Sequence, residues 1–262
     1  MSNDEWLNPG SSRLPRRPAA LARRVLSHRF AGGLVGAVAL TLGLFASTHS
    51  AVRTLPPDMS TPERVRLTSL MDTASISTRA EGEFLSRREV FEYLMNHPAF
   101  AGQVVQALRF SRLRIWPTKE GLYLDEGWGT TGLFWVVYGA DGTRVIYARG
   151  QHKVAILPPI YGEAVVMIDY RFAPAPDGRD LVKTAVTAFV KLDNRLLAAA
   201  LALGSSIAAK KAQSEARGIL KLFAKVSRAI EEDPANVYAK LREYPGVSEA
   251  ELEEFRPRLR LH

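Results

Sequence analysis

An uncharged apolar stretch near the N-terminus limits what this chain can fold into more than any other feature. Residues 30–52 contain no Lys, Arg, Asp or Glu, and their Gly-, Ala- and Leu-rich core shows no polar face. A helix of about 19 residues spans roughly 28 Å, close to the ~30 Å hydrocarbon core of a bilayer. A buried helix of a globular domain would normally show a polar side. We therefore expect residues 30–50 to form a transmembrane helix or the apolar part of a signal segment.

The charges around this stretch predict its orientation. Residues 1–29 form a basic segment with six arginines against two carboxylates, whereas Arg53 is the only charged residue near the other end before Asp58. The positive-inside bias then leaves the N-terminus in the cytoplasm and exports the rest. We expect a single-pass protein of the cytoplasmic membrane with its domain outside, in the periplasm. Secretion after signal cleavage is the alternative, although Thr48-His49-Ser50 matches a cleavage site poorly.

Composition narrows the possible chemistry of the remaining chain. The 262 residues are 47% hydrophobic and 24% charged, as in a folded protein. They include no cysteine, which excludes disulfides, thiolate metal sites and cysteine nucleophiles. Half of the net charge of +8 lies in residues 1–50, so the exported part is only mildly basic. We therefore expect the membrane, and not nucleic acid, as a partner. Gly32 and Gly36 have the spacing of a helix-dimer motif, but the oligomeric state stays open.

The exported part begins with a linker and short elements. Residues 51–73 combine a Pro-Pro linker with a short helix that opens at Thr61-Pro62, because proline suits the first helical turn. Ser86 and Glu89 have the spacing of a capping box, which predicts a helix start. A weak strand over 74–82 precedes this helix, and a second helix over 99–109 follows it.

Residues 112–192 change to the two-residue period of strands. No helix-length pattern interrupts this part of the chain, so we expect antiparallel strands joined by hairpins. Asp141-Gly142 is typical of a tight hairpin turn. The predicted strands are 112–116, 121–126, 132–139, 144–157, 162–172 and 181–192.

Helices are predicted for the rest of the chain. Apolar residues recur at helical spacing over 193–231, which indicates one long helix. Residues 232–262 form a helical extension, in which Asp233-Pro234 restarts a helix. Ser248 and Glu251 match a second capping box.

This order of elements resembles the helix-grip superfamily, which includes START lipid-transfer domains, polyketide cyclases and aromatases, and birch-pollen-allergen-like proteins. The run Glu83–Met95 followed by His97-Pro98 is similar to the first helix of those domains. The resemblance covers about 74–231 and implies an α+β fold with an antiparallel sheet wrapped around a long C-terminal helix. The chain departs from the pattern in its N-terminal segment and in 232–262.

A twisted sheet around a helix often leaves a cavity between them, and its lining selects the ligand. Large aromatics with polar tips suit a lipid or another hydrophobic small molecule, although strands favour aromatics in any core. We expect membrane-tethered binding or transfer of such a molecule. The candidate ligand-binding residues are Trp128, Phe134, Trp135, Tyr138, Tyr147, Tyr161, Tyr170 and Phe189.

Strand alternation predicts which side chains face solvent. The face of strand 162–172 that we expect to be solvated carries Tyr161, Glu163, Val165, Met167, Asp169 and Arg171. A solvated sheet face with cross-strand ion pairs is the more ordinary interpretation. If this charged face lined a cavity instead, Arg149, Glu163 and Asp169 could bind a polar head group.

Nothing in the sequence forms a recognisable catalytic or metal motif. His97 and His152 lack partners at ligand spacing, and no Gly-x-Ser-x-Gly is present. We assign no catalytic residue, no metal and no cofactor. Two rivals stay open: a cyclase-, aromatase- or hydrolase-like enzyme using Tyr161, His152 or Asp169, and an envelope scaffolding protein that binds a partner through residues 235–262.

Overall fold

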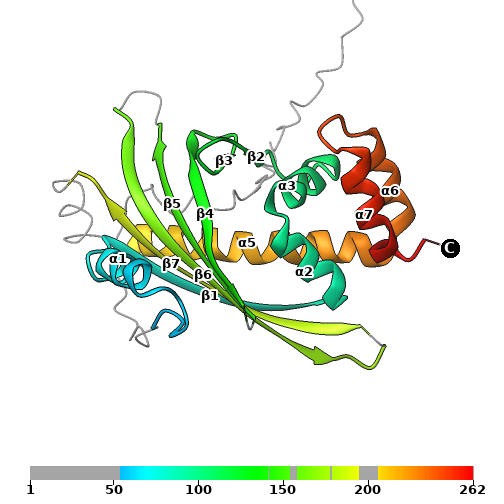
Figure 1. Cartoon of the computed structure of the whole chain (residues 1–262), viewed down its shortest axis with the longest axis horizontal. Helices are drawn as coiled ribbons and strands as arrows, with labels where there is room; N and C mark the ends of the chain where they lie inside the picture. The colour runs from blue at the N-terminus through cyan, green and yellow to red at the C-terminus, as the bar shows by residue number, and fades with distance from the viewer. Residues whose placement is uncertain (1–53, 141, 154–157, 178, 195–205, 262) are drawn as a thin grey trace, which may run out of the picture. The chain divides into compact units, whose positions relative to one another are not determined.

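A computed structural model describes residues 54–140, 142–153, 158–177, 179–194 and 206–261 (Figure 1). The predicted membrane segment at 30–50 and the first part of the predicted long helix, 195–205, lie outside the described residues. Among the helices that are described, none combines the length and the apolar composition needed to cross a bilayer. The membrane segment therefore stays a prediction.

The centre of the protein is a seven-stranded sheet in the order β1-β7-β6-β5-β4-β3-β2, in which every neighbouring pair is antiparallel (Figure 1). The predicted hairpin at Asp141-Gly142 joins β4 to β5, because Ala140 pairs with Thr143. Gly142 has φ 72°, and a Cβ there would lie 2.3 Å from the Tyr170 carbonyl oxygen, so this turn requires glycine. The strands are β1 (Ile76–Ser86), β2 (Arg114–Pro117), β3 (Leu122–Asp125), β4 (Thr130–Ala140), β5 (Thr143–His152), β6 (Ile160–Pro174) and β7 (Asp180–Leu192).

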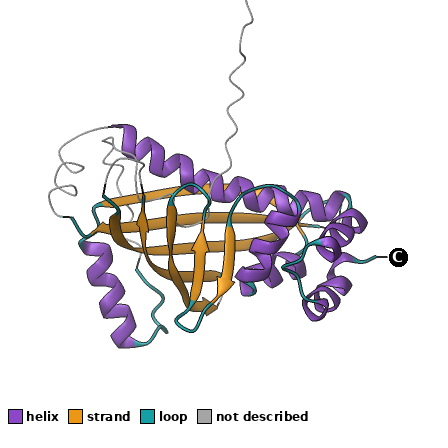
Figure 2. Ribbon diagram, turned by 90° about the horizontal axis from the view of Figure 1, so that it is seen from above, coloured by secondary structure: helices purple, strands orange, loops and turns teal. Residues whose placement is uncertain are grey.

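One long helix covers the inner face of the sheet. Helix α5 (Ser206–Glu232) runs along the strands (Figure 2), where Ala216, Ile219 and Leu220 join the sheet side chains in one apolar core. Its closest approach is to β1, where Gly82 leaves room for Leu220, since a Cβ at Gly82 would lie 3.3 Å from Leu220 Cδ1. The chain is thus an α+β protein with a sheet packed on a C-terminal helix, which is consistent with the helix-grip architecture.

The outer face, opposite α5, is also buried over its middle. Helix α1 (Thr61–Asp72) and the segment 54–60 lie on it, and Val165 and Met167 are 0% and 2% exposed. The prediction that this face of β6 is solvated is therefore wrong at its centre. Alternation correctly separates the two faces, but the cover comes from a segment about a hundred positions earlier in the chain. We call this the outer cluster; its buried members are Leu55, Met59, Leu67, Leu70, Val145, Tyr147, Val165 and Met167.

Four short helices gather around the C-terminal half of α5 in a second apolar core, which we call the helical cluster. Phe255 is fully buried there, with its ring 5.0 Å from that of Phe100 and 5.2 Å from that of Tyr93. The predicted capping box at Ser248 and Glu251 is confirmed, with both of its backbone contacts present. The apolar residues of the extension face this core, so the described residues after 234 expose no large hydrophobic side chain of the kind that the scaffolding alternative needs. The helices are α2 (Arg88–Asn96), α3 (Pro98–Ala107), α6 (Pro234–Glu243) and α7 (Glu249–Leu259).

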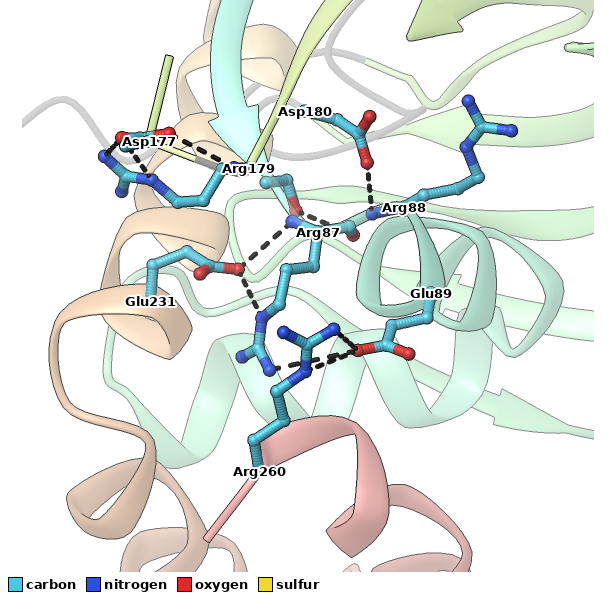
Figure 3. Close-up of polar contacts among 9 residues, drawn as sticks. Arg87, Arg88, Glu89, Asp177, Arg179, Asp180, Glu231 and Arg260 are labelled. Atoms are coloured by element: carbon cyan, nitrogen blue, oxygen red, sulfur yellow. Dashed lines mark hydrogen bonds and ion pairs between the residues drawn. The ribbon is translucent and has the colours of Figure 1, made fainter. Parts of the chain in front are cut away.

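The start of α2 differs from its prediction. The N-cap is Arg87, and Ser86 donates its hydroxyl to the Arg87 carbonyl instead of capping the helix. Carboxylates from distant elements accept the free backbone N–H groups: Glu231 takes that of Arg87 at 3.1 Å and Asp180 that of Arg88 at 3.2 Å (Figure 3). The predicted capping box is therefore wrong: the helix starts one residue later, and carboxylates from distant elements accept the N–H groups of its N-cap and first helical residue.

Candidate functional site

A small cavity lies on the inner face of the sheet, where α2, α3 and α5 meet β2, β4, β5 and β6. Its volume is about 80 Å³. The walls are apolar, with Met95 from α2, Val105 from α3, Phe134 from β4 and Phe223 from α5 among them. Of the described residues that line it, only Arg144 and Ser227 bring a polar side chain. An apolar chamber with one polar end suits an amphipathic or hydrophobic ligand.

Arg144 forms that polar end. This residue is 7% exposed, and its Nη2 donates to Glu92 Oε2 at 3.2 Å and to Asn96 Oδ1 at 2.8 Å. The hydroxyl of Tyr170 donates to the same Glu92 oxygen at 2.8 Å. Gly139 makes room for this arrangement, since a Cβ there would lie 3.1 Å from Arg144 Cδ. Because Glu92 already balances the charge of Arg144, the cavity presents a polar but neutral end.

The local environment changes the acidity of Tyr170. Burial raises the pKa of its hydroxyl, and the hydrogen bond that it donates to Glu92 raises the pKa further. An ordinary tyrosine ionises near pH 10. The folded pKa is thus above the unfolded one, so the stability that this group contributes is complete below about pH 10 and is lost as the pH rises above that value.

We expect Tyr170→Phe to reduce the alkaline loss of stability. Between about pH 9 and pH 11 the wild-type protein should lose more free energy of unfolding than the variant, because the variant has no hydroxyl to ionise at this position. Urea unfolding at the two pH values measures this difference. Equal losses in the two proteins would contradict the assigned environment of Tyr170.

Two of the eight aromatics predicted to bind ligand lie on the inner face. Phe134 lines the cavity. Tyr170 is linked to the polar end of the cavity, because its hydroxyl donates to Glu92, which also accepts from Arg144. Trp128 and Tyr161 are 56% and 52% exposed. The others lie on the face opposite α5 and so cannot line the space between sheet and helix, and ligand contact by any of the eight stays a prediction. These outer-face residues are Trp135, Tyr138, Tyr147 and Phe189.

In the described residues, the acid–base side chains named for the enzyme alternative do not converge on one site. His152 Nδ1 lies 2.8 Å from the hydroxyl of Thr130, which donates to Glu126. Tyr161 and Asp169 lie on the face of the sheet away from His152, so these three side chains do not share one site. His97 stacks on Tyr93 with ring centroids 4.0 Å apart. Within the described ranges, no group of three or more metal-binding side chains is arranged around one point.

Sequence reasoning missed the residues at the polar end of the cavity. Arg144 is the useful signal, because it shares a face with Ile146 and Ala148 and is the only charged residue of that run. A cation on an apolar strand face predicts a buried partner. The partner itself, Glu92 on α2, has no local signature in the sequence.

Comparison with known proteins adds little to this picture: no family model and no curated protein matches the chain. A conserved protein from Geobacillus kaustophilus aligns with TM-score 0.42 and 11% identity over 59% of this chain and 97% of its own. The hypothetical protein jhp0584 from Helicobacter pylori aligns with TM-score 0.39 and 11% identity over 70% of this chain and 100% of its own. Ara h 8.0201 aligns with TM-score 0.27 and 12% identity over 59% of this chain and 99% of its own. Since all three scores lie below 0.5, the helix-grip resemblance depends on the sheet topology and on the position of α5.

Proposed function

We propose that this protein binds a lipid or another hydrophobic small molecule in the cavity between the sheet, α2–α3 and α5, and that residues 30–50 hold it in the cytoplasmic membrane with the domain outside. The observation that supports binding is the cavity itself, an apolar chamber with Arg144 at one end. The uncharged run in the sequence supports the tether. A carrier held at the bilayer would need to move its ligand only a short distance, which suits transfer.

The volume of the cavity limits how a ligand enters. About 80 Å³ is less than the ~150 Å³ of an engineered cavity that accepts benzene. A whole lipid therefore requires the cavity to widen. Met95 and Phe223 are half-buried at its wall, and the unbranched side chain of Met95 can change rotamer more easily than a branched one. We propose that movement of these two side chains admits an acyl chain.

Native mass spectrometry of the detergent-extracted full chain tests binding directly. We expect a hydrophobic molecule to copurify, or a fluorescent fatty acyl probe to bind with saturation. The same spectrum gives the intact mass, which shows whether the N-terminal segment is retained. A protein that carries no molecule and binds no acyl, sterol or phospholipid probe would refute the proposed function.

A large side chain at the opening of the cavity should weaken ligand binding without unfolding the protein. Val136 lines the cavity but is 42% exposed, so Val136→Trp can place its ring over the opening with little strain in the core. We expect the probe affinity to fall about tenfold or more, because the ring occupies space that the ligand needs. Val65→Trp on α1 is the matched control, since Val65 is 63% exposed and does not line the cavity. Equal affinities for the two variants would place the ligand elsewhere.

A further inference from the structure

We infer that the outer face of the sheet at β2–β4, with the loop before β4, carries a tryptophan–arginine surface that docks on an anionic bilayer. This surface is separate from the cavity, and it depends on the proposed function only for the tether at residues 30–50. We define it by three tryptophans and the arginines that contact them: Trp116, Trp128, Trp135, Arg112, Arg114 and Arg149.

Two of the three tryptophans are accessible for their size, whereas Trp135 is half-buried. Trp116 is 39% and Trp128 56% exposed, and they are two of only five exposed large hydrophobic residues in the described part of the chain. On the outer face Trp116 pairs with Tyr123, their rings 4.8 Å apart, and Tyr123 pairs with Leu133 on the next strand. An exposed tryptophan beside half-buried apolar neighbours indicates an interaction surface. Tryptophan in particular favours the boundary between lipid and water.

An arginine accompanies each tryptophan. The guanidinium carbon of Arg112 lies 4.3 Å from the ring centroid of Trp128, that of Arg149 5.7 Å from Trp135, and that of Arg114 5.9 Å from Trp116. A guanidinium that stacks on a ring keeps N–H donors at its edge, and these suit the phosphate of a lipid head group.

Nearby carboxylates offset part of this positive charge. Asp125 pairs with Arg114, and Glu120 Oε2 lies 3.7 Å from Arg149. Arg112 remains, together with the exposed Lys119 and Lys153. The surface therefore keeps a net positive charge, which attracts anionic lipids.

The course of the chain favours a bilayer as the occupant. Leu55 and Met59 are buried in the outer cluster, and the Tyr138 hydroxyl donates to Asp58 Oδ2 at 2.8 Å, so the chain enters the domain on the outer face. Leu55 lies five positions after residue 50, a reach of roughly 18 Å at most. Trp135 stacks on Tyr147 of the outer cluster at 5.4 Å. The Trp135 end of the surface therefore adjoins the point where the chain enters the domain.

Tryptophan quenching by brominated lipids tests this docking in the full chain. Trp6→Phe first removes the tryptophan of the basic segment, and the protein is reconstituted in phosphatidylcholine vesicles with and without phosphatidylglycerol, their acyl chains brominated near the carboxyl end. We expect quenching to be strong with phosphatidylglycerol and to weaken as salt rises. Replacing Trp116 and Trp128 by Phe should remove most of it.

A charge-matched pair of triple variants separates this surface from general basicity. Arg112→Gln, Arg114→Gln and Arg149→Gln together should remove at least half of the quenching. The control changes three exposed arginines on the C-terminal helices, Arg228, Arg242 and Arg256, to Gln and should leave the quenching as it was. Equal loss in both triple variants, or no dependence on phosphatidylglycerol, overturns the proposal.

Separate measurements keep the three ideas distinguishable. Resistance of vesicle association to alkaline carbonate reports the tether, and probe binding in detergent reports the cavity. If the chain leaves the vesicles in carbonate, the tether is wrong, and salt-sensitive cosedimentation with phosphatidylglycerol vesicles then decides the docking surface. Tryptophan and arginine also bind single-stranded nucleic acid, so binding of an oligonucleotide that is lost in the first triple variant without any effect on vesicles would overturn the lipid assignment.

Discussion

Glu231→Ala is expected to lower the free energy of unfolding by about 3–4 kcal/mol, because it leaves the buried cation of Arg87 without its main partner. The side chains of Arg87 and Glu231 are 9% and 8% exposed, and Nε of Arg87 donates to Glu231 Oε1 at 3.0 Å. The same carboxylate accepts the Arg87 backbone N–H, so the start of α2 loses a cap as well (Figure 3). Glu89 does not replace it, since it lies 4.0 Å from Arg87 and also pairs with Arg260 at 3.0 Å.

Chemical denaturation of the full chain in detergent measures this loss. Glu232→Ala is the matched control: its side chain is 70% exposed, and its ion pair among the described residues is with the exposed Arg228, so we expect a change below about 0.5 kcal/mol. Replacing both members of the buried pair, as Arg87→Met with Glu231→Leu, should recover much of the stability, because no uncompensated charge then remains. A small effect of Glu231→Ala would mean that water reaches Arg87 in solution.

Phe255→Ala is expected to lower the free energy of unfolding by about 3–5 kcal/mol, the usual cost of removing a fully buried aromatic ring. Phe255 is 0% exposed at the centre of the helical cluster, where Tyr93 and Phe100 contact it. The loss would show that residues 232–262 are part of the folded unit, whereas an independent extension would melt alone and leave the rest unchanged.

Thermal unfolding followed by near-ultraviolet circular dichroism separates these outcomes. We expect one transition that moves to lower temperature as a whole. Arg256→Ala, one position further along α7 and exposed, should shift it little. A second, earlier transition in Phe255→Ala with the main one unmoved would contradict the single folded unit.

Local patterns predicted the elements whose cause is local. The strands of 112–192 follow from two-residue alternation and from turn chemistry such as Gly142, and the sheet is antiparallel as expected. Ser248 and Glu251 form their capping box because both partners lie within one helical turn. Ser86 and Glu89 have the same spacing but do not form one, since the N-cap is Arg87, and Glu231 and Asp180 accept the N–H groups of Arg87 and Arg88. A capping motif predicts a helix start well but cannot exclude a competing tertiary partner.

The candidate site was predicted less completely than the fold. Phe134 was identified as a lining residue, but aromatic character alone could not separate it from Trp135, which is its neighbour in sequence and points to the other face. Alternation gives two faces, and the choice between them depends on what packs on each. Here both faces are covered, one by α5 and the other by α1 and residues 54–60, so hydrophobicity did not reveal which side holds the cavity.

The amino-acid sequence by itself determined the strand-rich middle, the helices at both ends of it and the uncharged run at 30–52, because each depends on residues close together in the chain. Only the tertiary structure decided that α1 buries the centre of the outer face, that Glu92 neutralises Arg144 and that Glu231 holds Arg87. These contacts join segments that are 50 to more than 140 positions apart. Their formation depends on the assembled geometry, which no local period or spacing encodes.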